Sequence, residues 1–284
     1  MRKIYFVLIV IFLSTLPNQI YGIEEIDTRK NILITKSNSM EEINFDGKWT
    51  FYNEWKQTSW NSIKSDNNTV FHLRIAHQEN FIYILMDVIS DTNANIGSDK
   101  ATVCIDSKNN KSKFFDSDDY CFIVQLGERN FIDTLLNKQD NFVIQGNSQE
   151  KSFEELKKIK VKDFVGIGTM SDKEDKYSEI SHVSYEFKIP IELIGRSDNY
   201  GFYVNVFDAS SNVVYSWPED IKLESFEIPS PSLWGNLISP DKSLLENSNN
   251  ESMDFFVILF IIAVAISTVI FFILFKKRSF KEIK

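Results

Sequence analysis

The sequence of 284 residues predicts an all-β fold, an antiparallel β-sandwich that precedes one C-terminal transmembrane helix. Three observations support this prediction. Short segments rich in aromatic and β-branched residues alternate with polar turns between residues 44 and 238, which is typical of sandwiches and barrels. A later stretch, at 255–275, contains no charged residue. In addition, the two cysteines of the chain fall at matching positions of one predicted hairpin.

The N-terminus has the features of a secretory signal peptide. Arg2 and Lys3 precede an apolar run at 4–13, and the small residue Gly22 comes before a polar stretch. The run is short for a membrane span, which needs ~20 residues, although a first membrane anchor is the alternative. We therefore expect a signal peptide over residues 1–22, followed by an N-terminal lead segment over residues 23–43.

The C-terminus is expected to hold a membrane anchor. Residues 255–275 form an uncharged run of 21 residues, and a helix of that length crosses about 30 Å of hydrocarbon. The tail at 276–284 has five basic residues against Glu282, so the positive-inside bias places it in the cytoplasm. The polar, periodless stretch at 239–254 is predicted to be a stalk. The predicted location is the cell membrane, with a single pass and an extracytoplasmic N-terminal domain.

The charge of the exported part narrows its partners. Residues 23–254 carry 24 Lys and Arg against 39 Asp and Glu, a net charge of about −15. Nucleic-acid binders present basic patches, so nucleic acid is excluded as a partner. The acidity indicates either a soluble surface domain or the binding of cations. The sequence contains no G-x-S-x-G, H-E-x-x-H or P-loop motif, and we therefore predict a protein without catalytic activity.

The predicted domain over residues 44–238 reads as one unit, because no internal segment resembles an interdomain linker. A tight polar turn joins the predicted strands at 70–77 and 81–90. One short helix is expected after Ser152, because the side chains of Ser152 and Glu155 have the spacing of a capping box.

Cys104 and Cys121 lie in two alternating segments separated by a polar turn. If these segments pair as a hairpin, the two cysteines are opposite one another on the same face. Disulfides persist in exported proteins, so we predict a bond between them. A reduced buried pair and a metal site are the alternatives, although two cysteines without nearby histidines make a poor zinc site.

An ordered set of motifs resembles carbohydrate-binding modules of family 9 and their DOMON-like relatives. The motifs, in chain order, are INFDGKWTFYNEW, FIYILMDVISD, VCIDS, YEFKIPIELIG, GFYVNVFDAS, SWPED and LWGNLI. The resemblance covers nearly the whole predicted domain. It implies an antiparallel sandwich, often stabilised by calcium, that binds the ends of sugar chains between aromatic rings and is associated with glycoside hydrolases.

Five tryptophans are the candidate platforms for a sugar. In the family pattern the Trp that closes the first motif packs in the core, which implies a structural role for Trp55, and Trp49 is expected to be buried as well. Trp60 is expected in a polar loop, between Ser59 and Asn61, and is predicted to be the most exposed of the three. Sugar recognition needs aromatic faces together with polar groups for the hydroxyls. The predicted carbohydrate-binding residues are Trp60, Tyr215, Trp217, Glu219 and Trp234. The alternative for Trp217 and Trp234 is that they close the core beneath long loops.

Calcium is the predicted metal, with four carboxylates of one hairpin end as its ligands. Calcium prefers six to eight oxygen ligands on flexible loops. The candidates are Asp106, Asp116, Asp118 and Asp119. A solvated turn without a metal is the alternative.

The resulting hypothesis is a non-catalytic, membrane-anchored carbohydrate-binding module, associated with glycan capture or carbohydrate catabolism at the cell surface. A cell-envelope structural domain that holds a protein partner is the alternative from another class. A haem-binding electron-transfer domain is the third hypothesis, because some DOMON-like relatives bind haem through His or Met. Its candidate ligands are Met86, His72, His77 and His182.

Overall fold

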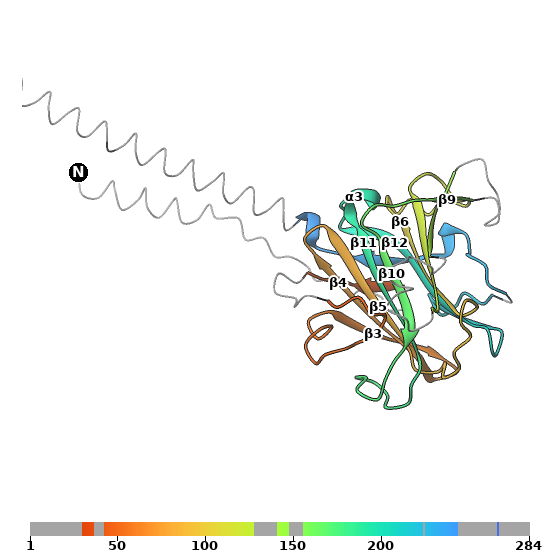
Figure 1. Ribbon diagram of the computed structural model, residues 1–284. Helices are drawn as coiled ribbons and strands as arrows, with labels where there is room; N and C mark the ends of the chain where they lie inside the picture. Colours follow the sequence, from red (N-terminus) through yellow and green to blue (C-terminus); the bar gives the residue numbers. More distant parts are fainter. Residues whose placement is uncertain are drawn as a thin grey trace, which may run out of the picture.

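Two β-sheets packed face to face form the body of the protein, so the predicted all-β sandwich is confirmed (Figure 1). The structure is a computed structural model, and it describes residues 30–36, 43–127, 141–147, 156–223, 225–243 and Ile266. Neighbouring strands are antiparallel except for β1 with β14 and β2 with β4, which are parallel. Within the described residues one sheet has eight strands and the other six.

The eight-stranded sheet has the order β1-β14-β12-β6-β7-β8-β9, and β13 also pairs with β12. Its strands are β1 (Asn31–Leu33), β6 (Lys100–Asp106), β7 (Asp119–Gln125), β8 (Phe142–Gln145), β9 (Lys157–Ile159), β12 (Asn199–Asp208), β13 (Val213–Trp217) and β14 (Gly235–Ile238).

The six-stranded sheet has the order β10-β11-β5-β4-β2, and β3 also pairs with β4. Its strands are β2 (Thr35–Lys36), β3 (Ser59–Ser65), β4 (Asn68–Gln78), β5 (Phe81–Val88), β10 (Val165–Met170) and β11 (Val183–Pro190). Two short helices follow strands of the sandwich, α3 (Ile191–Ile194) and η2 (Pro231–Leu233). The predicted tight turn is confirmed between β4 and β5, where Gln78 pairs with Phe81 and Glu79 has a φ of 53°.

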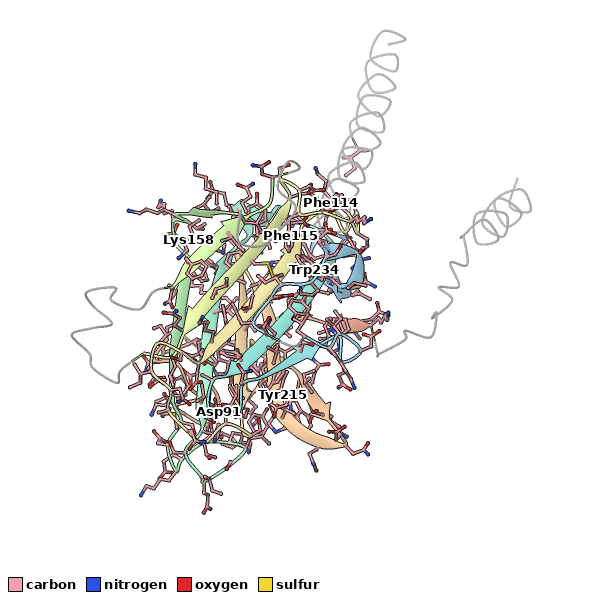
Figure 2. All side chains as sticks on the ribbon, turned by 90° about the vertical axis from the view of Figure 1, so that its right-hand side faces the viewer. Asp91, Phe114, Phe115, Lys158, Tyr215 and Trp234 are labelled. Carbon is pink, nitrogen blue, oxygen red and sulfur yellow. A yellow bond between two sulfur atoms is a disulfide. The ribbon has the colours of Figure 1, made fainter. Side chains whose placement is uncertain are left out.

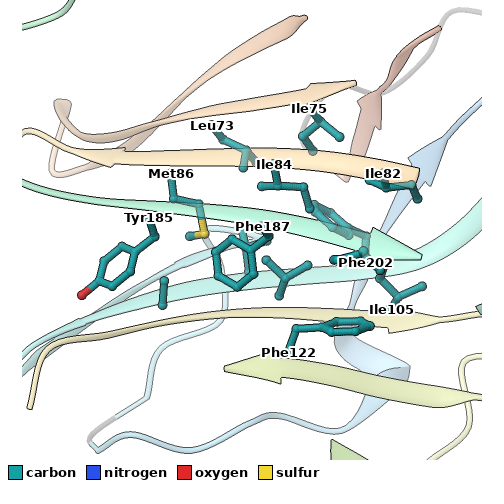
Figure 3. Packing of buried hydrophobic residues seen from close by; sticks show 14 of the residues in the cluster. Leu73, Ile75, Ile82, Ile84, Met86, Ile105, Phe122, Tyr185, Phe187 and Phe202 are labelled. Carbon is teal, nitrogen blue, oxygen red and sulfur yellow. The ribbon is translucent and has the colours of Figure 1, made fainter. Parts of the chain in front are cut away.

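The main core lies between the two sheets and contains one face of every long strand (Figure 3). Successive side chains of a strand point to opposite faces, so every second residue enters this core. In β6, for example, Val103 and Ile105 belong to it whereas Cys104 points away. Large apolar side chains fill the space, including Leu73, Ile84, Met86, Phe122, Phe187 and Phe202.

The outer faces of both sheets are also covered, which explains why the strands read as almost continuous apolar runs. On the eight-stranded sheet, Tyr203, Ile123 and Ile144 pack under Trp234 and form a second cluster with the two cysteines. Figure 2 shows Phe115 and Trp234 together near the disulfide, and Asp91 and Tyr215 at the opposite end of the molecule. On the six-stranded sheet, the segment over residues 43–58 contributes a third cluster.

The third cluster confirms that two of the tryptophans are structural. Trp55 is fully buried and Trp49 is 5% exposed, and both pack against Ala76 and Leu85 of the sheet. The indole Nε1 of Trp55 donates a hydrogen bond of 3.0 Å to Glu186 in β11. The N–H of Gly47 donates to the other carboxylate oxygen of Glu186, over 2.7 Å. The segment is thus fastened to the sheet by both apolar packing and buried hydrogen bonds.

The predicted disulfide is confirmed. Cys104 in β6 and Cys121 in β7 are paired directly across the hairpin. Their Sγ atoms are 2.00 Å apart and their Cα atoms 4.1 Å apart. Both side chains belong to the cluster on the outer face of the eight-stranded sheet.

The domain is longer at both ends than the sequence predicted. Strand β1 pairs with β14 and β2 pairs with β4, so part of the expected lead segment at 23–43 belongs to the sandwich. After the predicted end at 238, Ser239 and Asp241 are buried and hydrogen-bonded, so the stalk does not begin at 239. Strands of two or three residues are too short to show a period, which is why the sequence did not reveal them.

Some predicted segments lie outside the described residues. These are the signal peptide at 1–22, the tail at 276–284 and, apart from Ile266, the membrane span at 255–275. Among the described residues, no helix is both long enough and apolar enough to cross a membrane. Ser152 and Glu155 also lie outside, but Lys157–Ile159 forms strand β9 on the edge of the sheet instead of continuing a helix.

Candidate functional site

Three stacked rings lie on the outer face of the six-stranded sheet, and we call Trp60, His72 and Tyr177 the aromatic platform. Trp60 lies on β3 and His72 on β4, whereas Tyr177 comes from the loop between β10 and β11. The ring centroid of Tyr177 is 3.8 Å from that of His72 and 6.2 Å from that of Trp60. The ring plane of Tyr177 is inclined by 26° to that of His72 and by 20° to that of Trp60, so Tyr177 stacks on both rings.

The strand register explains why these residues meet on one face. Ser62 pairs with His72, and Trp60 pairs with Arg74, so Trp60, Ser62, His72 and Arg74 point to the same side of the sheet. Strand β3 pairs only with β4 among the described strands of this sheet, which leaves Trp60 at an edge. Trp60 as a whole residue is 57% exposed.

Arg74 fixes the position of Tyr177. The Nε of Arg74 donates a hydrogen bond of 2.5 Å to the Tyr177 hydroxyl. Its Nη1 donates to the carbonyl of Trp55 over 3.1 Å, and the guanidinium lies 4.8 Å from the ring centre of Trp49. Arg74 therefore joins the β10–β11 loop, the 43–58 segment and β4, and it holds the platform ring in place.

The hydrogen bond between Trp60 and His72 requires a neutral imidazole. The indole Nε1 donates to Nδ1 of His72 over 3.1 Å. The pKa of His72 is lowered to about 4, mainly by burial and to a smaller extent by the positive charges of Arg74 and His182. Nδ1 of His72 therefore keeps its lone pair at neutral pH, and the platform presents no charge on this ring.

Beneath Tyr177 lies a buried group of two carboxylates and a histidine, which we call the Asp–His cluster: Asp87, Asp175 and His182. One ligand atom from each of the three residues lies within 4.8 Å of the others. Asp87 projects from β5, opposite His72 of β4. Burial raises the pKa of Asp87 to about 6, against the opposing effect of its hydrogen bond with His182. These three side chains could hold a metal ion.

A second group of carboxylates with the same spacing is formed by Asp91, Asp99 and Asp208. Burial and the charge of Asp99 raise the pKa of Asp91 to about 7. Each carboxylate already accepts a backbone hydrogen bond. The backbone N–H of Asn93 donates to Asp91, and the N–H groups of Asn95 and Ala209 donate to Asp99. The N–H groups of Ser210 and Ser211 donate to Asp208. The group closes the loops at one end of the sandwich.

The structure separates the predicted carbohydrate-binding residues. Trp60 is exposed as predicted, although it lies on a strand instead of a loop. Trp217 and Trp234 are 4% and 3% exposed, so neither ring offers an open face, and the alternative reading of both as closing plugs is the correct one. Trp217 packs on Phe202 in the main core, with ring centroids 5.9 Å apart.

Trp234, Tyr215 and Glu219 are likewise not part of the aromatic platform. The Trp234 indole donates to the carbonyl of Pro229 over 2.9 Å inside the second cluster. Tyr215 is half-buried against the main core. Glu219 is exposed and accepts a hydrogen bond of 3.1 Å from the N–H of Lys64, near the end of β3 away from Trp60. The predicted site is therefore reduced to Trp60.

The four aspartates predicted to bind calcium do not form a single set of ligands. Asp106 and Asp119 are buried partners across the β6–β7 hairpin. The Asp106 carboxylate accepts hydrogen bonds from the backbone of Asn110 and Lys111, and that of Asp119 from Asp116. These bonds fold the hairpin loop. Calcium at this loop stays a prediction without a preformed arrangement of ligands.

Asp116 and Asp118 contact other side chains of the same hairpin loop. Asp116 accepts a hydrogen bond of 3.0 Å from the side chain of Asn110, and Asp118 forms an ion pair of 3.1 Å with Lys108.

The candidate haem ligands are enclosed by the fold. Met86 is fully buried in the main core. His77 is also fully buried, and its ring lies between the Ser239 hydroxyl and the carbonyl of Glu79. His72 and His182 are occupied in the platform and in the Asp–His cluster. Within the described residues, these side chains offer no open axial position.

Sequence reasoning missed Arg74 and Tyr177 as functional candidates, and it considered His72 only as a haem ligand. His72 and Arg74 alternate with apolar residues in the segment 70–77, and this alternation was a usable signal that both face outward. Tyr177 lies in a charged loop without any period, so its place on the sheet could not be inferred.

Comparisons with known proteins found similarity among solved structures alone. No protein-family profile matches it, and no curated protein matches it. Among solved structures, it is similar to a carbohydrate-binding module of family 9 from Caldicellulosiruptor kristjanssonii in complex with glucose. That match has a TM-score of 0.42 and 14% identity, and covers 74% of this chain and 95% of that chain. The module in complex with cellotriose gives a TM-score of 0.40 and 14% identity, with 74% and 93% covered. Both are members of the family that the sequence motifs resemble.

Proposed function

We propose that the protein binds carbohydrate without catalysis, through the aromatic platform. The observation that carries this proposal is the exposed indole of Trp60, which is supported from behind by His72 and Tyr177. An aromatic face of this kind covers the apolar C–H face of a sugar ring. The sequence motifs shared with family 9 modules agree with this activity.

Polar groups for the sugar hydroxyls are present beside the indole. Ser62 of β3 lies on the same side of the sheet as Trp60 and is half-buried, and its hydroxyl lies 2.9 Å from that of Thr69. Hydroxyl and amide side chains both donate and accept hydrogen bonds, as a sugar requires. A neutral His72 adds no charge to the platform, which suits a neutral ligand.

The test is a glycan array probed with the full-length chain, followed by titration with the best glycan. Trp60→Ala should weaken binding about 10- to 100-fold, because covering a large apolar side chain contributes roughly 1.5–3 kcal/mol. Phe114→Ala is the matched control, since Phe114 is 45% exposed on the β6–β7 loop, away from the platform. Retention of no glycan, or equal binding by both variants, would refute the proposal. A stoichiometric protein partner recovered without any dependence on sugar would favour an envelope interaction domain instead.

We also propose that the domain is exported and held at the cell membrane by residues 255–275. The disulfide agrees with an oxidising compartment. Deletion of residues 255–284 should move the protein from the membrane pellet to the soluble fraction. A truncated protein that stays in the pellet after carbonate washing would show that the chain is held by something else.

A further inference from the structure

The Asp–His cluster is sealed from solvent. The side chain of His182 is 0% exposed, and those of Asp87 and Asp175 are each 1% exposed. His182 Nε2 lies 2.6 Å from Asp87 Oδ1 and 3.8 Å from Asp175 Oδ1. Two carboxylates without water are costly to bury unless a cation neutralises them.

The hydrogen bonds of His182 determine its tautomer, and so which ring nitrogen carries the lone pair that points to the carboxylates. Nδ1 lies 2.7 Å from the carbonyl oxygen of Ile180. A carbonyl only accepts, so Nδ1 carries a proton and donates it there. In the neutral imidazole, Nε2 therefore presents its lone pair to Asp87 and Asp175. A histidine that donates its other N–H to a backbone carbonyl has the arrangement usual for metal-binding histidines.

Two carboxylate oxygens of the cluster also favour a bound cation. Asp87 Oδ2 and Asp175 Oδ2 are both buried and have no hydrogen-bond partner among the residues that the structure describes. Oδ1 of Asp175, by contrast, accepts from the N–H of Tyr177 over 2.7 Å and from that of Ser178 over 3.2 Å. Apart from these two backbone N–H groups, the described residues around the cluster offer its carboxylate oxygens no donor other than a proton held on the cluster itself.

We propose that Asp87, Asp175 and His182 bind one divalent transition-metal ion, with zinc as the best-suited ion. Tetrahedral zinc with bonds of about 2.0–2.1 Å places its ligand atoms about 3.3 Å apart, and the observed 2.6 Å and 3.8 Å lie on either side of that distance. One imidazole with two carboxylates suits zinc, whereas calcium prefers six to eight oxygens.

The ion would join β5 to the loop between β10 and β11. Asp87 belongs to the sheet, whereas Asp175 lies two residues before Tyr177 in the loop. A metal bond to both would fix Tyr177 on His72. This proposal does not depend on carbohydrate binding.

The experiment is a zinc titration of the chelator-treated, full-length chain by calorimetry, with cobalt absorption spectra as a second measurement. We expect one zinc ion per chain. Asp175→Asn and His182→Gln each remove a direct ligand, so each should weaken zinc binding by at least the roughly 10- to 100-fold typical of losing an outer-shell partner. Glu174→Gln is the matched control in the same loop, because the Glu174 side chain is 75% exposed, and it should bind zinc like the wild type.

Three results would overturn the proposal. The first is a chelator-treated wild type that takes up no zinc and melts at the same temperature with and without it, which means that protons alone hold the cluster. The second is equal zinc affinity in Asp175→Asn and Glu174→Gln. If the variants fail to fold, X-ray absorption of the zinc-loaded wild type decides, and a zinc environment without an imidazole would be the third.

Discussion

Removing the Cys104–Cys121 bond tests the β6–β7 hairpin and the energetics of the outer cluster together. The two residues are 17 apart in sequence. In the chain-entropy model, a bond that closes a loop of this length stabilises the fold by about 3 kcal/mol, because it restricts the unfolded chain. Both side chains are almost fully buried, at 0% and 1% exposure. Alanine is therefore the suitable replacement, since a serine would also bury an unpaired hydroxyl.

Cys104→Ala and Cys121→Ala should each lower the free energy of unfolding by about 3 kcal/mol. The double variant should lie within about 1 kcal/mol of either single variant, because all three lose the same bond. Urea unfolding followed by tryptophan fluorescence measures these values, and the wild type with a reductant should match the variants.

Two results would refute this reasoning. One is a double variant whose loss equals the sum of the two single losses, because the cysteines would then act independently. The other is a pair of reactive thiols in the denatured, unreduced protein, which would exclude the bond and the register that places Asp106 opposite Asp119.

Three further predictions concern the clusters on the outer faces. Burial raises the pKa of Glu186 well above its usual value, so the folded protein keeps a proton that the unfolded chain releases above about pH 4.3, and stability falls as the pH rises from there. Glu186→Gln should reduce the slope of the urea midpoints measured between pH 4.5 and neutrality without abolishing it, because Asp87 and Asp91 also have raised pKa values, and an unchanged slope would contradict the assignment. Gly47 has a φ of 90°, and an added Cβ would lie 2.8 Å from Thr169 Cγ2, so Gly47→Ala should cost about 1–3 kcal/mol in thermal unfolding. Gly97→Ala, at a φ of 74° with nothing within 4 Å, should cost less, and equal losses would show that the contact with Thr169 is unimportant. Trp234→Ala should cost about 3–5 kcal/mol through the cavity it leaves while glycan retention is unchanged, and a selective loss of retention would return Trp234 to the site.

The parts of the fold that sequence reasoning found depend on local pattern. Cys104 and Cys121 lie on adjacent strands joined by one turn, so their register followed from alternation alone. The turn after Gln78 was found for the same reason. Strands β1 and β2 were missed because two or three residues carry no period, and their pairing depends on strands far away in the sequence.

The candidate site was only partly predictable, because it depends on which surfaces the chain covers. Trp217 and Trp60 both lie on strands beside polar residues, yet one is buried between the sheets and the other lies at an open edge. The difference is made by long-range packing. Tyr177 reaches the platform through Arg74, more than a hundred residues away in the chain, and no local signal encodes that contact.

The parallel pairing of β1 with β14 determines how the domain responds to force. Asn31 pairs with Asn236, and Leu33 pairs with Ile238. Because the strands run the same way, the first residue of β1 and the last residue of β14 lie at opposite ends of this ladder. A pull between the two ends of the domain therefore acts along the strands and loads their hydrogen bonds in shear, all at once. Such a ladder ruptures at a higher force than one opened bond by bond, so the sandwich should resist a pull applied between the two ends of the domain.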